Sequence, residues 1–394
     1  MSEQMVNNSG ISALCHVCRK ESLVPVPGYG ALSQVTSDCK PWHGGSQLCL
    51  CRSCGCVQKI VNREWLSETE AIYAQYSIYH QGNGSEQQVF ENDSGMASSR
   101  SHKLLEHALP LLALPQTGRF LDVGCGNGAM LRSFQSMAPE WRLAGTELND
   151  KYRSEIEGIA GKPVLYTCTL PEIPETFDMI SMLHLLEHII DPQAFLADIR
   201  NKLAADGTVL IEVPDYLYNP FDLLIADHCS HFSKQTLEQI LVSAGFDIVS
   251  ITTEWIPKEL SVIARKSKLS IEPVAPVETT SYEESLNMLN KRVQWLQDIA
   301  HTAKRLSTQG HFGIFGTSIA GTWLYNEAGG ANFFVDEDIH RIGQTYMGKP
   351  IYHPADVPVA SNVFLAQPPE VTKNICSRLS ISGRDITFTL PPEI

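Results

Sequence analysis

The chain has 394 residues and a formal net charge of −14. This length exceeds what one ordinary hydrophobic core holds, so two or three domains are expected. Apolar residues make up 43% and charged residues 19%, which is typical of a globular protein and excludes a largely disordered one. The negative charge disfavours nucleic acid or an anionic membrane as a partner, and no run is apolar enough to span a bilayer.

The first ten residues, MSEQMVNNSG, lack the basic and apolar regions of a signal peptide. The cytoplasm is therefore the expected compartment. In a reducing compartment, clustered cysteines favour a metal site over disulfides.

Cysteines are concentrated near the start of the chain, where seven of the eleven lie between Cys15 and Cys56. Two CxxC pairs stand out, and each can direct two thiolates at one ion: Cys15 with Cys18, and Cys51 with Cys54. Cys39, Cys49 and Cys56 are spare, and Cys49 or Cys56 could replace a member of the set. The spacing predicts a structural Zn²⁺ site and a small zinc-knuckle domain over residues 11–65.

Residues 66–110 are predicted to form a helical connection. Tyr73, Tyr76 and Tyr79 recur every three residues, which places them on one side of a helix. Two interpretations stay open at this point. The tyrosines pack that face, or one hydroxyl projects into a neighbouring active site.

Residues 111–266 carry the strongest pattern. An apolar strand from Phe120 to Val123 leads into a glycine turn with Gly124, Gly126 and Gly128, and then into a helix. Glycines let the backbone approach a ligand closely, and a helix start offers free N–H groups. The next predicted strand ends at Glu147, where a carboxylate can accept hydrogen bonds from ribose hydroxyls.

Further strands alternate with helices, which predicts a parallel, doubly wound α/β sheet with ligands at the carboxyl ends of its strands. The motifs LDVGCGNG, Glu147 and FDMISMLHLLEHIIDP resemble those of class I S-adenosylmethionine-dependent methyltransferases. The resemblance implies a Rossmann-like core with S-adenosyl-L-methionine as cofactor. It assigns the cofactor site to Asp122, Gly124, Cys125, Gly126, Gly128, Glu147, Leu148 and His184.

Residues 283–394, after a linker rich in Pro, Thr and Ser, are predicted to form a second α/β, Rossmann-like unit. It opens with a long amphipathic helix, whose apolar stripe is Leu286, Leu289, Val293, Leu296, Ala300 and Ala303. Gly316, Gly321 and Asp336 imitate part of a dinucleotide fingerprint, but the full GxGxxG is absent. We therefore expect this unit to cover the active site and to hold part of the substrate.

The order of cysteine knuckles, methyltransferase core and second α/β unit resembles the three-domain sugar C-methyltransferases, over nearly the whole chain. CRSCGCVQ and GTSIAGTWLYNEAG carry this resemblance at the two ends. It implies a small-molecule substrate that is polar and sugar-derived, with nucleotide-linked sugars included. A monomer or homodimer is expected. The acceptor atom stays open between carbon, oxygen and nitrogen, and a non-catalytic zinc-knuckle adaptor with a vestigial core is a further alternative.

The same resemblance marks catalytic candidates in the stretch IADHCSHFS. His228 matches the family's catalytic histidine, while Asp227 replaces a glutamate and Ile225 a tyrosine. Elsewhere, His188 matches an active-site histidine and His184 replaces an asparagine. Tyr76 matches the first tyrosine of the family's N-terminal motif, but Ile78 stands where the second would be.

Methyl transfer requires removal of a proton from the acceptor, a task that suits a histidine oriented by a carboxylate. His228 is the first candidate for this base. On a helix, Asp227 and His231 would share a face, which makes His231 a rival. A metal held by Asp227, His228, Cys229 and His231 is disfavoured, because consecutive residues seldom converge on one ion. Alternatively, the histidines merely precede a helix capped by Ser233.

Overall fold

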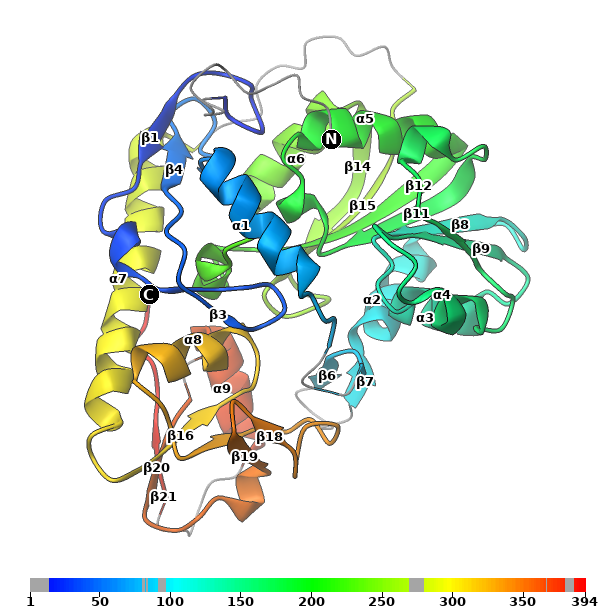
Figure 1. Ribbon diagram of the computed structural model, residues 1–394. Helices are drawn as coiled ribbons and strands as arrows, with labels where there is room; N and C mark the ends of the chain where they lie inside the picture. Colours follow the sequence, from blue (N-terminus) through cyan, green and yellow to red (C-terminus); the bar gives the residue numbers. More distant parts are fainter. Residues whose placement is uncertain are drawn as a thin grey trace.

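Three larger β-sheets and two short ribbons organise the chain, and a long helix joins two of the sheets (Figure 1). The computed structural model describes residues 14–79, 82, 84–90, 97–268, 280–365, 367–379 and 386–394. Most of the predicted linker before residue 283 lies outside these ranges. No helix of the described segments is both long and apolar enough to cross a membrane.

A seven-stranded sheet forms the central layer. In spatial order its strands are β10 (Val164–Tyr166), β9 (Arg142–Thr146), β8 (Arg119–Val123), β11 (Phe177–Leu183), β12 (Leu203–Pro214), β15 (Glu259–Lys266) and β14 (Phe246–Thr252). The first five are parallel, and β15 runs antiparallel to both of its neighbours. The strand order reverses beside β8, so the carboxyl ends of β8 and β11 form the edge where such sheets bind ligands.

Successive side chains of the central strands enter different cores, as alternation along a strand requires. Phe120 and Met179 pack with three helices, whereas Leu121 and Ile180 pack with two others. The first group of helices is α2 (Arg100–Ala108), α3 (Ala129–Met137) and α4 (Arg153–Glu157). The second group is α5 (Pro192–Lys202) and α6 (Lys234–Ser243). The sheet is therefore covered on both faces, as the parallel order predicts.

The N-terminal sheet is antiparallel, and its fourth strand comes from the middle of the chain. Its strands are, in spatial order, β1 (Leu23–Pro25), β4 (Leu48–Cys51), β5 (Val57–Lys59) and β13 (Ser230–His231). Two short ribbons lie before and after helix α1 (Arg63–Ala74) in the sequence. The first pairs β2 (Gln34–Val35) with β3 (Pro41–Trp42), and the second pairs β6 (Gln88–Phe90) with β7 (Ala97–Ser99). The region of residues 14–65 is thus completed by the histidine-rich segment of the core.

The C-terminal sheet repeats the doubly wound pattern. Its strands are, in spatial order, β18 (Thr345–Tyr346), β19 (Lys349–Tyr352), β17 (Phe333–Val335), β16 (His311–Phe315), β20 (Ser361–Phe364) and β21 (Ile386–Thr389). All pairs are parallel except β18 with β19. Its helices are α7 (Tyr282–Leu306), α8 (Ile319–Glu327) and α9 (Pro369–Arg378).

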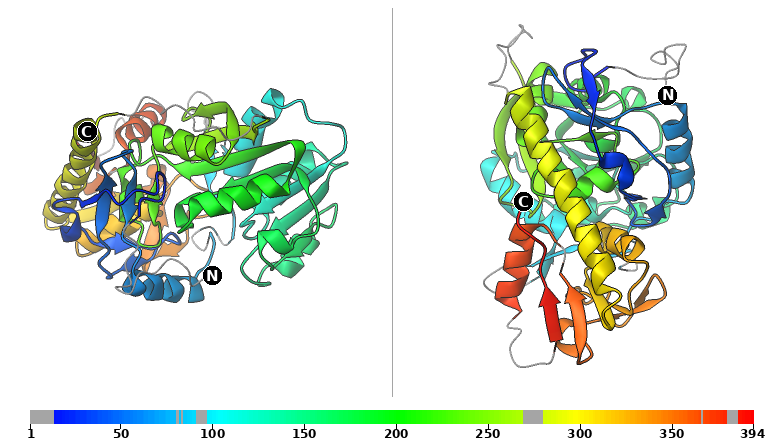
Figure 2. Two further views of the ribbon diagram at one scale, coloured as in Figure 1. Left: turned by 90° about the horizontal axis from the view of Figure 1, so that it is seen from above. Right: turned by 90° about the vertical axis from the view of Figure 1, so that its left-hand side faces the viewer.

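Helix α7 is the long amphipathic helix that the sequence predicts, and a capping box of Ser281 and Glu284 starts it. Leu289, Val293 and Leu296 are buried in one core that also holds residues of the N-terminal and C-terminal sheets. Figure 2 shows α7 crossing the molecule from the N-terminal sheet toward the C-terminal sheet. Burial of this stripe therefore ties both ends of the chain together.

Candidate active site

The glycine turn lies at the carboxyl end of β8, where the doubly wound order predicts a ligand. Gly126 adopts a left-handed φ of 54°, and a Cβ there would lie 2.5 Å from Cδ1 of Ile78. A larger residue at this position would meet both backbone strain and a clash. The turn brings Cys125 against Gly145 of β9, where a Cβ on the glycine would lie 2.5 Å from the cysteine sulfur.

Glu147 follows β9 and faces the same turn. Its carboxylate accepts hydrogen bonds from the backbone N–H groups of Gly126, at 2.5 Å, and Leu148, at 3.2 Å. Burial raises its pKa, although both hydrogen bonds oppose that change. In the neighbouring strand, Asp122 accepts a 2.6 Å hydrogen bond from Ser181, and burial raises its pKa to about 7. The structure therefore brings the predicted glycines and acids to one strand edge.

His184 lies directly after β11, with a left-handed φ of 50°. Its ring nitrogens lie 3.4 Å from Glu187, 3.4 Å from Glu212 and 3.8 Å from Glu259. Burial and Arg100 oppose its protonation, but the carboxylates of Glu259, Glu187 and Glu212 raise its pKa to about 10. The structure thus surrounds this predicted cofactor residue with acids that the sequence did not single out.

Asp222 is the residue that organises the two candidate bases. Its Oδ1 accepts a 2.7 Å hydrogen bond from Nδ1 of His228, and its Oδ2 accepts a 2.7 Å bond from Nδ1 of His231. A carboxylate only accepts at neutral pH, so both rings carry a proton on Nδ1. Burial opposes the charge on Asp222, but His231 and His228 hold its pKa below the usual range.

The helix expected to pair Asp227 with His231 is absent from the described structure. Residues 226–227 form a turn, residues 230–231 form β13, and α6 begins only at Lys234, capped by Ser233 as predicted. Hydrogen bonding of β13 to β5 extends the segment and overrides the helical spacing. The carboxylate partner of His231 is consequently Asp222 and not Asp227.

Asp227 instead lies beside His188. Nδ1 of His188 lies 3.5 Å from Oδ2 of Asp227 and 3.0 Å from its backbone carbonyl oxygen. Ser37 holds the carboxylate through its backbone N–H, at 2.8 Å, and its hydroxyl, at 2.5 Å. The rings of His188 and His228 meet edge to face with centroids 4.5 Å apart. The N-terminal region therefore positions the catalytic candidates of the core.

A tyrosine hydroxyl does reach these histidines, but it belongs to Tyr73. Its oxygen lies 3.1 Å from Nδ1 of His188, while Tyr76 packs edge-on against the ring of Tyr73 at 6.2 Å. The predicted helical face is interrupted because α1 ends at Ala74. The tyrosine in direct contact with His188 is therefore Tyr73, whereas the family pattern favours Tyr76.

Asp222 and Lys59 also lie near this site, and neither was singled out in the sequence. Lys59 is completely buried on β5 and donates to the backbone carbonyl of Ile225. Burial lowers its pKa to about 8, although Asp227 and Asp222 oppose this shift. In the sequence, Lys59 is marked only by its position just after a cysteine knuckle, and a lysine in such a place is ordinarily exposed to solvent.

The four predicted metal ligands converge in space. The sulfurs of Cys15 and Cys54 lie 3.5 Å apart, those of Cys18 and Cys51 lie 3.6 Å apart, and all four are within 4.8 Å of one another. Tetrahedral Zn–S bonds of about 2.3 Å separate sulfurs by roughly 3.8 Å, so the set fits zinc. The spare cysteines are not part of this group.

Both knuckles have the same turn. The backbone N–H of Arg19 donates to Cys15 O at 2.9 Å, and that of Gly55 donates to Cys51 O at 3.0 Å. Both residues have a left-handed φ, 60° and 73°. Within the first knuckle, His16 Nδ1 lies 2.7 Å from the hydroxyl of Ser230 on β13. The metal cluster is therefore connected directly to the strand that carries His231.

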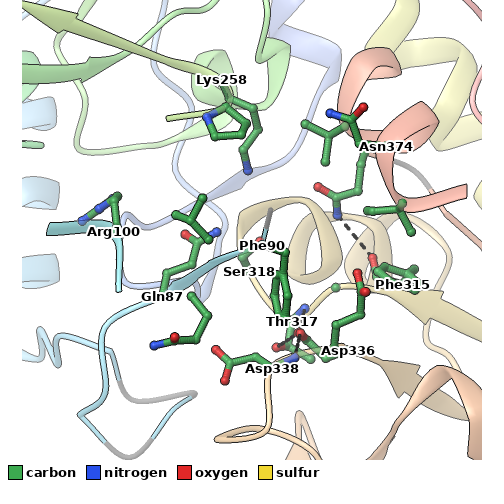
Figure 3. A pocket seen from close by; sticks show the side chains of 18 of the residues that line it. Gln87, Phe90, Arg100, Lys258, Phe315, Thr317, Ser318, Asp336, Asp338 and Asn374 are labelled. Carbon is green, nitrogen blue, oxygen red and sulfur yellow. Dashed lines mark hydrogen bonds between the residues drawn. The ribbon is translucent and has the colours of Figure 1, made fainter. Parts of the chain in front are cut away.

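A cavity of about 150 Å³ separates the central and C-terminal sheets (Figure 3). Arg100, Lys258 and Glu259 line its core side. Thr317 and Ser318, at the start of α8, line the other side with residues that follow β17 and β20. In the C-terminal unit, Asp336 accepts hydrogen bonds from the hydroxyl of Thr317 at 2.7 Å and from its backbone N–H at 3.2 Å. The cavity thus lies at the ligand edge of the second α/β unit.

The central region matches a known domain. Residues 96–251 fit the family model described as a methyltransferase domain. Together with the reversed strand order and the glycine turn, this match defines the region as a class I S-adenosylmethionine-dependent methyltransferase domain.

Curated relatives are similar to this chain over part of their length. One is the ubiquinone biosynthesis O-methyltransferase of Parvibaculum lavamentivorans, 35% identical over 98 residues, which cover 24% of this chain and 39% of that protein. A second is (S)-coclaurine N-methyltransferase of Thalictrum flavum, which is 25% identical over 42% of this chain and 50% of that protein. A third is the C-methyltransferase NovU of Streptomyces niveus, which is 26% identical over 41% of this chain and 40% of that protein. The chain therefore spans half or less of the length of these relatives.

Among solved structures, an S-adenosylmethionine-dependent methyltransferase from Clostridium acetobutylicum aligns with 51% of this chain and 97% of its own. The TM-score is 0.37 and the sequence identity 13%.

Proposed function

We propose that the chain transfers a methyl group from S-adenosylmethionine to a small polar, sugar-derived acceptor. The observation that carries this proposal is the meeting of two groups at one strand edge. Glu147 and the glycine turn form a nucleoside-binding edge after β8 and β9. Past β11, His188 lies against His228, a ring held by Asp222. These are the two components that proton removal and methyl transfer require.

The glycine turn and Glu147 fit the cofactor because they offer close backbone approach and a partly buried carboxylate for ribose hydroxyls. When bound, S-adenosylmethionine supplies the electrophilic methyl group. The chain's own task is to orient the acceptor and remove its proton. His228 suits this role, because Asp222 fixes its tautomer and raises its pKa despite burial.

The cavity between the two α/β units supports a sugar-derived, nucleotide-linked acceptor. It combines cationic side chains, Arg100, Lys258 and Arg341, with hydroxyl and backbone groups at the start of α8. Cations and a helix start suit phosphate oxygens, while Asp336 suits hydroxyl groups. We therefore assign the C-terminal unit to the part of the acceptor remote from the methylated atom.

We further propose that Cys15, Cys18, Cys51 and Cys54 hold a structural Zn²⁺. Sulfur separations of 3.5 and 3.6 Å support this assignment, as does the paired knuckle geometry. With four thiolates the ion has no open position for a substrate. Its role is to fix the sheet to which β13 belongs.

Substitution of Glu147 by alanine is expected to weaken S-adenosylmethionine binding at least about tenfold. A charge-assisted hydrogen bond contributes about 1.5–3 kcal/mol, and about 1.4 kcal/mol corresponds to a factor of ten in affinity. Calorimetry with the full chain measures this change. Glu172→Ala is a matched control, since that glutamate caps an exposed turn with Thr169. Absence of binding to the unsubstituted chain would overturn the proposed cofactor.

Oxygen or nitrogen methylation is the second candidate, favoured by the departures at Ile225, Asp227 and Ile78 from the sugar C-methyltransferase pattern. Carbon methylation next to a ketone passes through an enolate, whereas the alternatives need no C–H cleavage. We expect the chain to exchange that C–H for deuterium when nucleotide-linked keto sugars are incubated with it in D₂O. Exchange is followed by NMR. If none of them exchanges, the acceptor atom is oxygen or nitrogen.

A further inference from the structure

A second group of metal-ligand side chains lies apart from the cysteines. Glu187, His188 and His228 each offer one ligand atom, and these atoms lie within 4.8 Å of one another. They come from two segments, the turn after β11 and the turn before β13. The objection that consecutive residues seldom converge on one ion applies here only to Glu187 and His188, because His228 comes from a distant segment.

Both histidines are held as metal ligands usually are. Nδ1 of His228 donates to the carboxylate of Asp222 at 2.7 Å, and Nδ1 of His188 contacts the backbone carbonyl oxygen of Asp227 at 3.0 Å. Carbonyl and carboxylate oxygens accept hydrogen bonds, so each ring keeps its proton on Nδ1. Nε2 is then the nitrogen left to bind a metal. Metal-bound histidines typically have such a partner on their other nitrogen, which fixes ring orientation and increases basicity.

Glu187 supplies an independent indication. Glu187 is fully buried, and neither oxygen of its carboxylate makes a hydrogen bond to any described part of the chain. Its nearest charged neighbour is Nδ1 of His184, at 3.4 Å. Buried carboxylates are nearly always hydrogen-bonded or bound to a cation, because leaving them unpaired costs several kcal/mol. This carboxylate therefore has an ion-pair partner in His184 but no hydrogen bond within the described residues, and it lies beside the rings of His188 and His228.

We propose that Glu187, His188 and His228 bind a divalent transition-metal ion such as Zn²⁺ or Co²⁺. Two imidazoles and one carboxylate suit these ions and leave open positions for water. The neighbouring group of Asp222, His228 and His231 is a poorer site, because its carboxylate is already occupied by two 2.7 Å hydrogen bonds. Asp222 instead orients the ring of His228 through the hydrogen bond to its Nδ1.

The ion would regulate the proposed methyl transfer, and this consequence rests on the function proposed above. A ring nitrogen bound to a metal cannot accept a proton. Occupation of the site therefore withdraws His188 and His228 from deprotonation of the acceptor, and the ion acts as a reversible inhibitor. Ion binding itself needs neither cofactor nor acceptor.

The test is a Co²⁺ titration of the full, zinc-loaded chain by calorimetry and absorption spectroscopy. We expect one Co²⁺ per chain without thiolate-to-cobalt charge transfer, which separates this site from the cysteine cluster. Glu187→Gln and, separately, His228→Gln should each weaken this binding at least tenfold. A variant with His102→Ala and Glu106→Gln removes an exposed histidine–glutamate pair 3.5 Å apart and should bind Co²⁺ as the unsubstituted chain does.

Thermal unfolding of the same samples shows which variants are folded, Co²⁺ affinity is compared among those, and S-adenosylmethionine binding is measured separately. No binding outside the cysteine cluster would overturn the site. Equal loss in the surface variant would also overturn it, because the ion would then be adventitious. If Co²⁺ binds but S-adenosylmethionine does not, the metal site stands and the proposed function fails.

Discussion

His228→Ala is expected to lower kcat by about 10²- to 10⁴-fold, the usual contribution of a general base. The ring is buried, its Nδ1 is held by Asp222, and it packs edge to face with the ring of His188. Among the described residues, His228 is the one that both bonds Asp222 and packs directly against the ring of His188. S-adenosylmethionine affinity should stay within about twofold, because the glycine turn and Glu147 are separate from this ring. Single-turnover kinetics and calorimetry measure the two quantities.

The matched variant is His231→Ala, since His231 shares Asp222 with His228. We expect a smaller loss of kcat there, because His231 is completely buried on β13 and its ring centroid is 6.3 Å from that of His228. A larger loss in His231→Ala than in His228→Ala would reverse the assignment and make His231 the base. Unchanged turnover in both variants would exclude these histidines from proton transfer.

Cys51→Ser is expected to abolish zinc binding and to unfold the N-terminal sheet. Structural zinc contributes about 10 kcal/mol or more to small domains of this kind. A loss of even about 3 kcal/mol would lower the Tm by roughly 6–12 °C. Because β13 pairs with β5, and His16 bonds Ser230, the loss should also displace the histidine segment and reduce turnover. Metal analysis and thermal unfolding measure the effect.

Cys49→Ser is the control for that experiment. Cys49 lies on the same strand as Cys51 and is equally buried, but it does not belong to the sulfur cluster. We expect this variant to retain one zinc per chain and a Tm close to that of the unsubstituted protein. Loss of zinc from Cys49→Ser, with retention in Cys51→Ser, would assign the ligands differently.

Local patterns in the sequence were sufficient to predict the central and C-terminal elements. The apolar run from Phe120 to Val123, the glycine turn after it and the stripe along α7 each form what their spacing predicts. The cysteine pairs also lie where predicted, because each CxxC turn is a local structure and both knuckles adopt it. Such features depend on neighbours within a few residues, so the sequence records them directly.

The same local logic was wrong for the stretch from Ile225 to His231. On a helix the spacing would place Asp227 beside His231, but pairing of β13 with β5 extends the backbone. Tyr73 likewise contacts His188 because α1 ends at Ala74, which changes the direction of the tyrosines that follow. Both outcomes depend on segments that are far apart in the chain.

The sequence alone thus determined the types of element, the glycine turn with its acid, and the four thiolates. The tertiary structure alone decided the partners of the histidines: Asp222 for His228 and His231, and Asp227 with Tyr73 for His188. The physical reason is that a periodic pattern specifies which face a side chain occupies, whereas hydrogen bonds between segments depend on how the sheets pack. Contacts such as that of Ser37 with Asp227 span 190 residues, and no local spacing encodes them.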